Sequence, residues 1–137
     1  MLLFLAAIAL AVTVTPAVAA ELAVTVTGVS EAPGTVHLRL YRAAERFPDD
    51  DGFTAEATRP AAPGALTVRF TDVPEGAAAV MAFHDVDADG EMDRFLGMIP
   101  QEGYALSRDP RVMGPPAFDD SAVMVEGDTG ITMTMRY

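Results

Sequence analysis

The sequence predicts an all-β protein, an antiparallel β-sandwich of about seven strands. Short segments in which apolar and polar residues alternate, the pattern of half-buried strands, recur along the chain. Turn-forming residues separate these segments, and no long segment has the period of an amphipathic helix. With 137 residues, the chain has room for one such domain.

The first half of the domain contains three of the expected strands. Residues 22–28 alternate in hydropathy, and residues 36–41 do so after a turn-forming Ser-Glu-Ala-Pro-Gly sequence. Residues 66–71 repeat the pattern and give the third strand. Between the second and third strands, residues 42–64 are polar and rich in Ala, Pro and Asp. This composition predicts a long connection, with a helical turn near residues 43–46.

The second half contains a central strand and a terminal hairpin. Residues 77–83 are apolar on both faces, which is typical of a strand covered on both sides. Residues 97–120 are irregular, with three prolines toward the end of this stretch. Residues 122–125 and 131–135 flank a Glu-Gly-Asp-Thr-Gly turn, which predicts that the two segments pair as a hairpin.

The chain begins with the features of a secretory signal peptide. Residues 1–14 are uncharged and apolar, and small residues at positions −3 and −1 fit cleavage after Ala19 or after Ala20. The run is short for a membrane span, and no Lys or Arg precedes it. We therefore expect a signal peptide over residues 1–20 and a single periplasmic or secreted β-sandwich domain over residues 21–137. Membrane contact is expected only through the signal segment, if it stays uncleaved.

The composition excludes several functions. Acidic residues outnumber basic ones by 20 to 9, and the first twenty residues carry no charge, so the whole net charge of −11 falls on the domain. Such a domain repels phosphate backbones, which argues against nucleic-acid binding. The absence of cysteine excludes disulfides, thiolate metal ligands and a cysteine nucleophile. The three serines lack the sequence context of a hydrolase nucleophile, so we expect a non-catalytic protein.

The acidic loop after the central strand contains the densest group of candidate ligand side chains. Asp85, Asp87 and Asp89, followed by Gly90, match positions one, three, five and six of an EF-hand calcium loop. Position twelve is Leu96 instead of the bidentate glutamate, and no amphipathic helices flank the loop. We therefore expect a calcium-loop-like turn between strands. The candidate metal ligands are Asp85, Asp87, Asp89, Glu91, Asp93 and, as a ligand from outside the loop, Glu102.

Two hypotheses account for this loop. In the first, Ca²⁺ offsets the mutual repulsion of five closely spaced carboxylates, either to brace the fold or to organise a binding surface. In the second, the loop is a solvated acidic surface without an ion, and the protein is an interaction module that docks a basic partner or an envelope component. His84, at the end of the central strand, is expected to be hydrogen-bonded instead of metal-bound, and His37 is expected on the surface.

Several sequence blocks resemble one bacterial family of exported proteins, domain of unknown function 2141. The resemblance covers about residues 22–137. Its most specific blocks are His84 to Asp93, Gly97 to Tyr104 and Gly114 to Asp120, which keep the family's order and spacing. The resemblance implies a secreted or periplasmic sandwich of immunoglobulin-like or prealbumin-like type, without an established activity. It also implies that the acidic loop, residues 100–104 and residues 114–120 form one surface.

Overall fold

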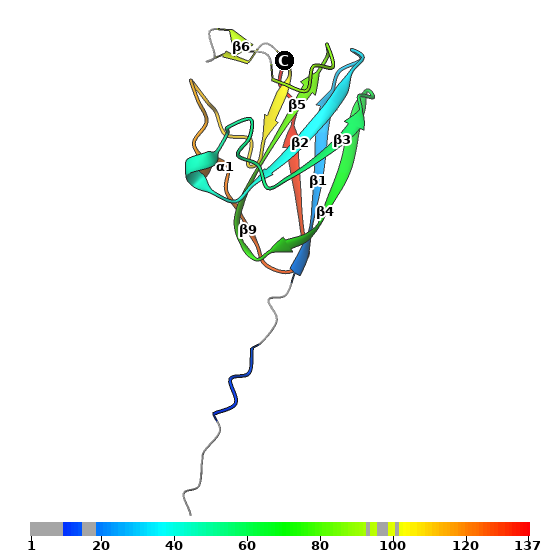
Figure 1. Ribbon diagram of the computed structural model, residues 1–137. Helices are drawn as coiled ribbons and strands as arrows, with labels where there is room; N and C mark the ends of the chain where they lie inside the picture. Colours follow the sequence, from blue (N-terminus) through cyan, green and yellow to red (C-terminus); the bar gives the residue numbers. More distant parts are fainter. Residues whose placement is uncertain (1–9, 15–18, 93, 96–98, 101) are drawn as a thin grey trace, which may run out of the picture.

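The computed structural model describes residues 10–14, 19–92, 94–95, 99–100 and 102–137. Two β-sheets pack face to face, and a short two-stranded sheet lies at one end (Figure 1). The all-β sandwich predicted from the sequence is therefore confirmed. Among the described residues, no helix has the length and apolar character needed to cross a membrane.

Eight strands build the two packed sheets. Their bounds are Ala19–Val29 (β1), Thr35–Tyr41 (β2), Ala55–Pro60 (β3), Gly64–Pro74 (β4), Gly76–Asp85 (β5), Tyr104–Leu106 (β8), Val123–Val125 (β9) and Thr129–Thr134 (β10). The smaller sheet has the order β10-β1-β4, and the larger has the order β3-β2-β5-β8, with β9 also paired to β5. The short sheet pairs β6 (Arg94–Phe95) with β7 (Ile99–Pro100). Two helical segments, η1 (Ala44–Arg46) and α1 (Phe118–Ser121), lie in the connections.

The sandwich core is aliphatic and follows the alternation read from the sequence. In β1, Leu22, Val24 and Val26 are fully buried, whereas the residues between them are partly exposed. They pack with inward side chains of the other strands, because each strand turns alternate residues toward the facing sheet. The main contributors from the other strands are Val36, Leu38, Leu40, Val68, Phe70, Val80, Ala82, Val125 and Met133, joined by Met135 just after β10.

A second apolar cluster covers the outer face of the larger sheet, and it is rich in aromatic residues. Tyr41 and Phe83 project from the sheet, while Phe47, Phe53 and Phe118 come from the connections that contain η1 and α1. Because these connections cover the outer face, β5 is buried from Ala78 to Asp85 on both sides. The predicted central strand with two covered faces is therefore confirmed.

The terminal hairpin predicted for residues 122–135 is wrong. The two segments are strands, but β9 pairs with β5 in the larger sheet, whereas β10 pairs with β1 in the smaller sheet. The pairing of β1 with β10 is also parallel, in an otherwise antiparallel sandwich. The turn between β9 and β10 therefore connects the two sheets. The alternating pattern specifies which side chains face inward but not which neighbour completes the backbone hydrogen bonds.

Two strands of the packed sheets, and β7 of the short sheet, lie in segments that were predicted to be irregular. Strand β3 falls within the polar connection 42–64, and β8 falls within residues 97–120. The sequence pattern that predicts a strand is weak in both. Strand β3 is a largely exposed edge strand that ends in a proline, and β8 has only three residues. The predicted helical turn near residues 43–46 is confirmed as η1.

Candidate metal site

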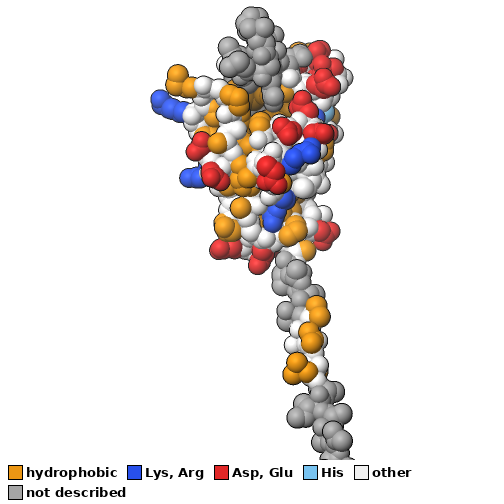
Figure 2. All heavy atoms as spheres, turned by 60° about the vertical axis from the view of Figure 1, so that its left-hand side comes forward, with side chains coloured by type: hydrophobic (Ala, Val, Ile, Leu, Met, Phe, Trp, Pro, Cys, Tyr) orange, Lys and Arg blue, Asp and Glu red, His pale blue; other side chains and the backbone are white. Residues whose placement is uncertain are grey.

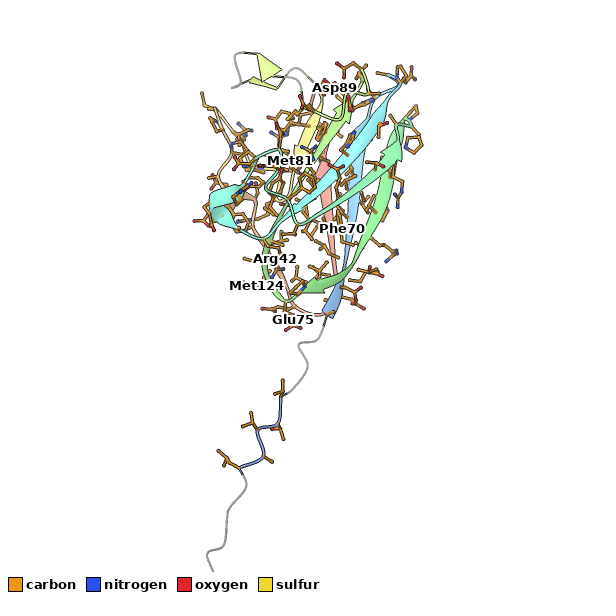
Figure 3. The ribbon with its side chains drawn as sticks, in the orientation of Figure 1. Arg42, Phe70, Glu75, Met81, Asp89 and Met124 are labelled. Atoms are coloured by element: carbon orange, nitrogen blue, oxygen red, sulfur yellow. The ribbon has the colours of Figure 1, made fainter. Side chains whose placement is uncertain are left out.

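The acidic loop leaves the end of β5 at the end of the sandwich opposite the N-terminal segment. In Figure 3, Asp89 lies at this end, while Glu75 and Met124 lie at the other. Figure 2 shows acidic side chains gathered near the same end, although carboxylates also occur elsewhere on the visible face. The loop turns through two residues with positive φ, Ala88 (58°) and Gly90 (78°). This left-handed conformation is what a glycine at position six of a calcium loop provides.

Three of the predicted ligands come together. Carboxylate oxygens of Asp85, Asp87 and Asp89 all lie within 4.8 Å of one another. Asp85 is the last residue of β5 and is buried, with 1% of its surface exposed, whereas Asp87 and Asp89 are exposed. The site therefore has one fixed carboxylate at its base and two solvent-facing carboxylates above it.

The base carboxylate, Asp85, accepts hydrogen bonds at both oxygens. Its Oδ2 accepts from the Gly90 amide (2.8 Å) and is 3.1 Å from His37 Nε2, while Oδ1 accepts from the Asp89 amide (3.2 Å). Burial alone raises the pKa of Asp85. The hydrogen bonds that Asp85 makes with the Gly90 amide, the Asp87 carboxyl group, His37 and the Asp89 amide together outweigh burial and hold the pKa below its ordinary value.

This lowered pKa predicts a loss of stability in acid. The ionised form of Asp85 is favoured by folding, so its contribution is present above the pKa of the unfolded chain, about 3.9. That contribution is lost as the pH falls through the lower pKa of the folded protein. Urea unfolding at a series of pH values, with chelator present, should show a shallower acid loss in Asp85→Asn than in the wild type. Parallel curves for the two proteins would contradict the prediction.

The remaining predicted ligands occupy different positions. Glu91 has an exposed side chain outside the three-carboxylate group, and its amide donates to Asp89 Oδ1 (2.8 Å). Glu102 is buried, and its Oε1 accepts from the Val86 amide (3.0 Å), so it contacts the loop backbone without joining the group. Asp93 lies outside the described residues. The spacing of acidic residues therefore identified the loop, while the structure separates its carboxylates into a converging set and supporting ones.

The far side of the loop is held by the outer face of the larger sheet. Arg39, on β2, donates from Nη2 to the Gly90 carbonyl (3.0 Å), from Nε to Glu56 (2.5 Å) and from Nη1 to Asp50 (3.2 Å). Met92 is buried in the aromatic cluster. The loop is thus attached at Asp85, at Gly90 and at Met92.

His37 is not on the surface, and the prediction that it would be is wrong. It has 9% of its surface exposed, contacts Asp85 and stacks on Phe83 with ring centroids 4.7 Å apart. The alternation of polar residues along this strand predicts that one of its faces is exposed to solvent. The structure covers that face with Phe53 and with the acidic loop, while Glu56 of the neighbouring strand β3 pairs with Arg39.

His84 is fully buried beside the loop, and both ring nitrogens have protein partners. Nε2 lies 2.9 Å from the Pro33 carbonyl, which can only accept, so in the neutral ring Nε2 carries the proton. Nδ1 then accepts from the hydroxyl of Tyr137 (2.8 Å), which in turn accepts from the Ser30 amide (2.9 Å). This matches the expectation of a hydrogen-bonded histidine.

The surface implied by the family resemblance is recovered in part. Glu102, in the 100–104 segment, accepts a hydrogen bond from the amide of Val86 in the loop. Phe118, in the 114–120 segment, packs in the same apolar cluster as Met92. Both segments therefore contact the loop or the residues that hold it.

These features define a class of protein: a small two-sheet β-sandwich with an acidic, calcium-loop-like turn at the end of a central strand. Residues 24–132 match the family described as "Uncharacterized protein conserved in bacteria (DUF2141)". The chain belongs to this family, as the resemblance predicted. Comparisons with curated proteins and with solved structures gave no match.

Proposed function

We propose that the protein is an exported, non-catalytic β-sandwich that binds Ca²⁺ in its acidic loop. The observation that supports this function best is the convergence of Asp85, Asp87 and Asp89 within 4.8 Å. Oxygen ligands lie about 2.3–2.6 Å from Ca²⁺, so two ligands of one ion are at most about 5 Å apart. The three carboxylates are therefore close enough to share one ion without a large movement of the loop.

Calcium binding and export support each other physically. Three carboxylates in close proximity repel one another, and a divalent cation relieves that repulsion. Outside the cytoplasm, a site with a Kd of about 10⁻⁴–10⁻³ M is filled. The bound ion would hold the loop against Arg39 and Met92, and so brace this end of the sandwich.

A non-catalytic role agrees with the positions of the nucleophile and base candidates. The His37 ring is hydrogen-bonded to Asp85. The His84 ring is hydrogen-bonded to the Pro33 carbonyl and to the Tyr137 hydroxyl. The hydroxyl of Ser107 is buried and donates to a backbone carbonyl, that of Ser121. None of these groups is presented to solvent as part of a nucleophile and base pair.

Calcium titration of the mature domain tests the proposal. We expect binding heat and, at ten times the Kd, a stabilisation of ~1.4 kcal/mol, which corresponds to a rise in melting temperature of roughly 5 °C. Asp87→Asn/Asp89→Asn should lose both effects. Asp119→Asn/Asp120→Asn, which removes the same charge from exposed residues of α1, should keep them. No heat and an unchanged melting temperature at millimolar calcium would contradict the proposal.

One observation favours the alternative, an ion-independent interaction module that docks a basic partner or an envelope component. Asp85 is already compensated by His37 and by two loop amides, so the loop has a defined conformation held by protein groups alone. Affinity capture from envelope extract in the presence of chelator distinguishes the two. A partner that is retained with chelator and lost with Asp87→Asn/Asp89→Asn would support the alternative.

A further inference from the structure

We propose that a signal peptidase cleaves the chain between Ala19 and Ala20, so that the mature domain begins at Ala20. This inference rests on the proposed export. The sequence by itself also allows a cut one residue later, because both positions have small residues at −3 and −1. In the proposed hydrolysis, water adds to the Ala19 carbonyl carbon, the peptide bond breaks, and Ala20 becomes the amino-terminal residue.

Packing of the domain begins at Ala20. This residue has 3% of its surface exposed, belongs to the sandwich core and lies opposite Val73 of β4. Ala19 is exposed and lies opposite Pro74, which has no amide proton to offer the strand ladder. A cut after Ala19 therefore leaves the core complete, whereas a cut after Ala20 removes one of its side chains.

The next residue, Glu21, is fixed on both its backbone and its side chain. Its amide donates to Asp128 Oδ1 (2.9 Å), in the turn between β9 and β10, and its carboxylate accepts from Arg69 (2.6 Å). With Ala20 retained, this nitrogen stays a neutral amide that donates to the Asp128 carboxylate. With Ala20 removed, the same nitrogen becomes the charged terminus of the chain, and the strand loses its first buried residue.

The mass of the exported protein tests the inference. The full chain, residues 1–137, is produced in a bacterial host and recovered from the periplasm or the medium. We expect the mass of residues 20–137. A mass lower by one alanine would overturn the inference and leave the export proposal standing, whereas full-length protein retained in the cell would overturn both.

A substitution at the cleavage position gives a second test. Ala19→Gln places a large residue at −1, where small residues are required, while the sequence of the expected mature domain stays unchanged. We expect the wild-type product to disappear. Any product cut after Ala20 should melt at a lower temperature than the wild-type domain. If Ala19→Gln gave the wild-type product in the wild-type amount, the inference would be wrong.

Discussion

Replacing Asp85 with alanine is expected to lower the free energy of unfolding by about 4 kcal/mol, even without calcium. The carboxylate has 1% of its surface exposed and accepts from two loop amides while contacting His37. Its removal leaves the half-buried Gly90 amide and the buried imidazole without this acceptor, at about 1–3 kcal/mol for each donor that water does not reach, while the Asp89 amide keeps Asp87 Oδ1 at 3.3 Å. Urea unfolding in the presence of chelator measures the effect.

Asp89→Ala is the matched control. Asp89 belongs to the same converging group but is exposed, so its replacement should cost less than about 1 kcal/mol without calcium. Both variants should lose the calcium-dependent rise in melting temperature. The comparison separates stabilisation of the fold from calcium binding, because Asp85 is expected to contribute to both and Asp89 only to calcium binding. Equal stability of the two calcium-free variants would show that Asp85 has no structural role.

The second large effect is expected at Arg39. We expect Arg39→Met to lower the free energy of unfolding by about 3 kcal/mol, because Arg39 has only 5% of its surface exposed and its guanidinium pairs with the partly buried Glu56. It lies between the rings of Phe53 and Phe83, 4.8 Å from each centroid, an arrangement worth about 1–2 kcal/mol. It also holds the Gly90 carbonyl of the acidic loop.

Arg69→Met provides the comparison for this prediction. Arg69 is also a strand arginine paired with a glutamate, Glu21, but 63% of its side chain is exposed. Ion pairs of this kind contribute about 0–1 kcal/mol, so this variant should stay close to the wild type. Chemical unfolding of both variants measures the difference. A similar loss in the two variants would mean that burial of Arg39 does not determine its contribution.

The sequence was most informative where a strand has at least one buried face. The alternation of Leu22, Val24 and Val26 predicted β1, and the continuous apolar run of residues 77–83 predicted a strand with two covered faces. These patterns arise from burial, which depends on each residue's own side chain. The pairing of β10 with β1 depends on residues more than a hundred positions apart, so no local pattern contained it.

The candidate site shows the same division. The spacing of Asp85, Asp87 and Asp89 identified the loop, because alternate carboxylates around a glycine turn can converge. The sequence did not predict that His37 and Arg39 contact the loop. Both are polar residues on a strand whose alternation predicts one solvent-exposed face. Their burial requires Phe53 and the loop itself to cover that face.

The sequence by itself determined that this is an acidic, cysteine-free β-sandwich with a calcium-loop-like spacing of carboxylates after a central strand, because composition, alternation and spacing are local properties. Only the tertiary structure decided which of those carboxylates meet and what supports them. Asp85 lies at the base of the loop because β5 is buried on both sides up to its last residue. Two residues from β2, an adjacent strand, then provide the charged and hydrogen-bonding groups that hold the loop in place.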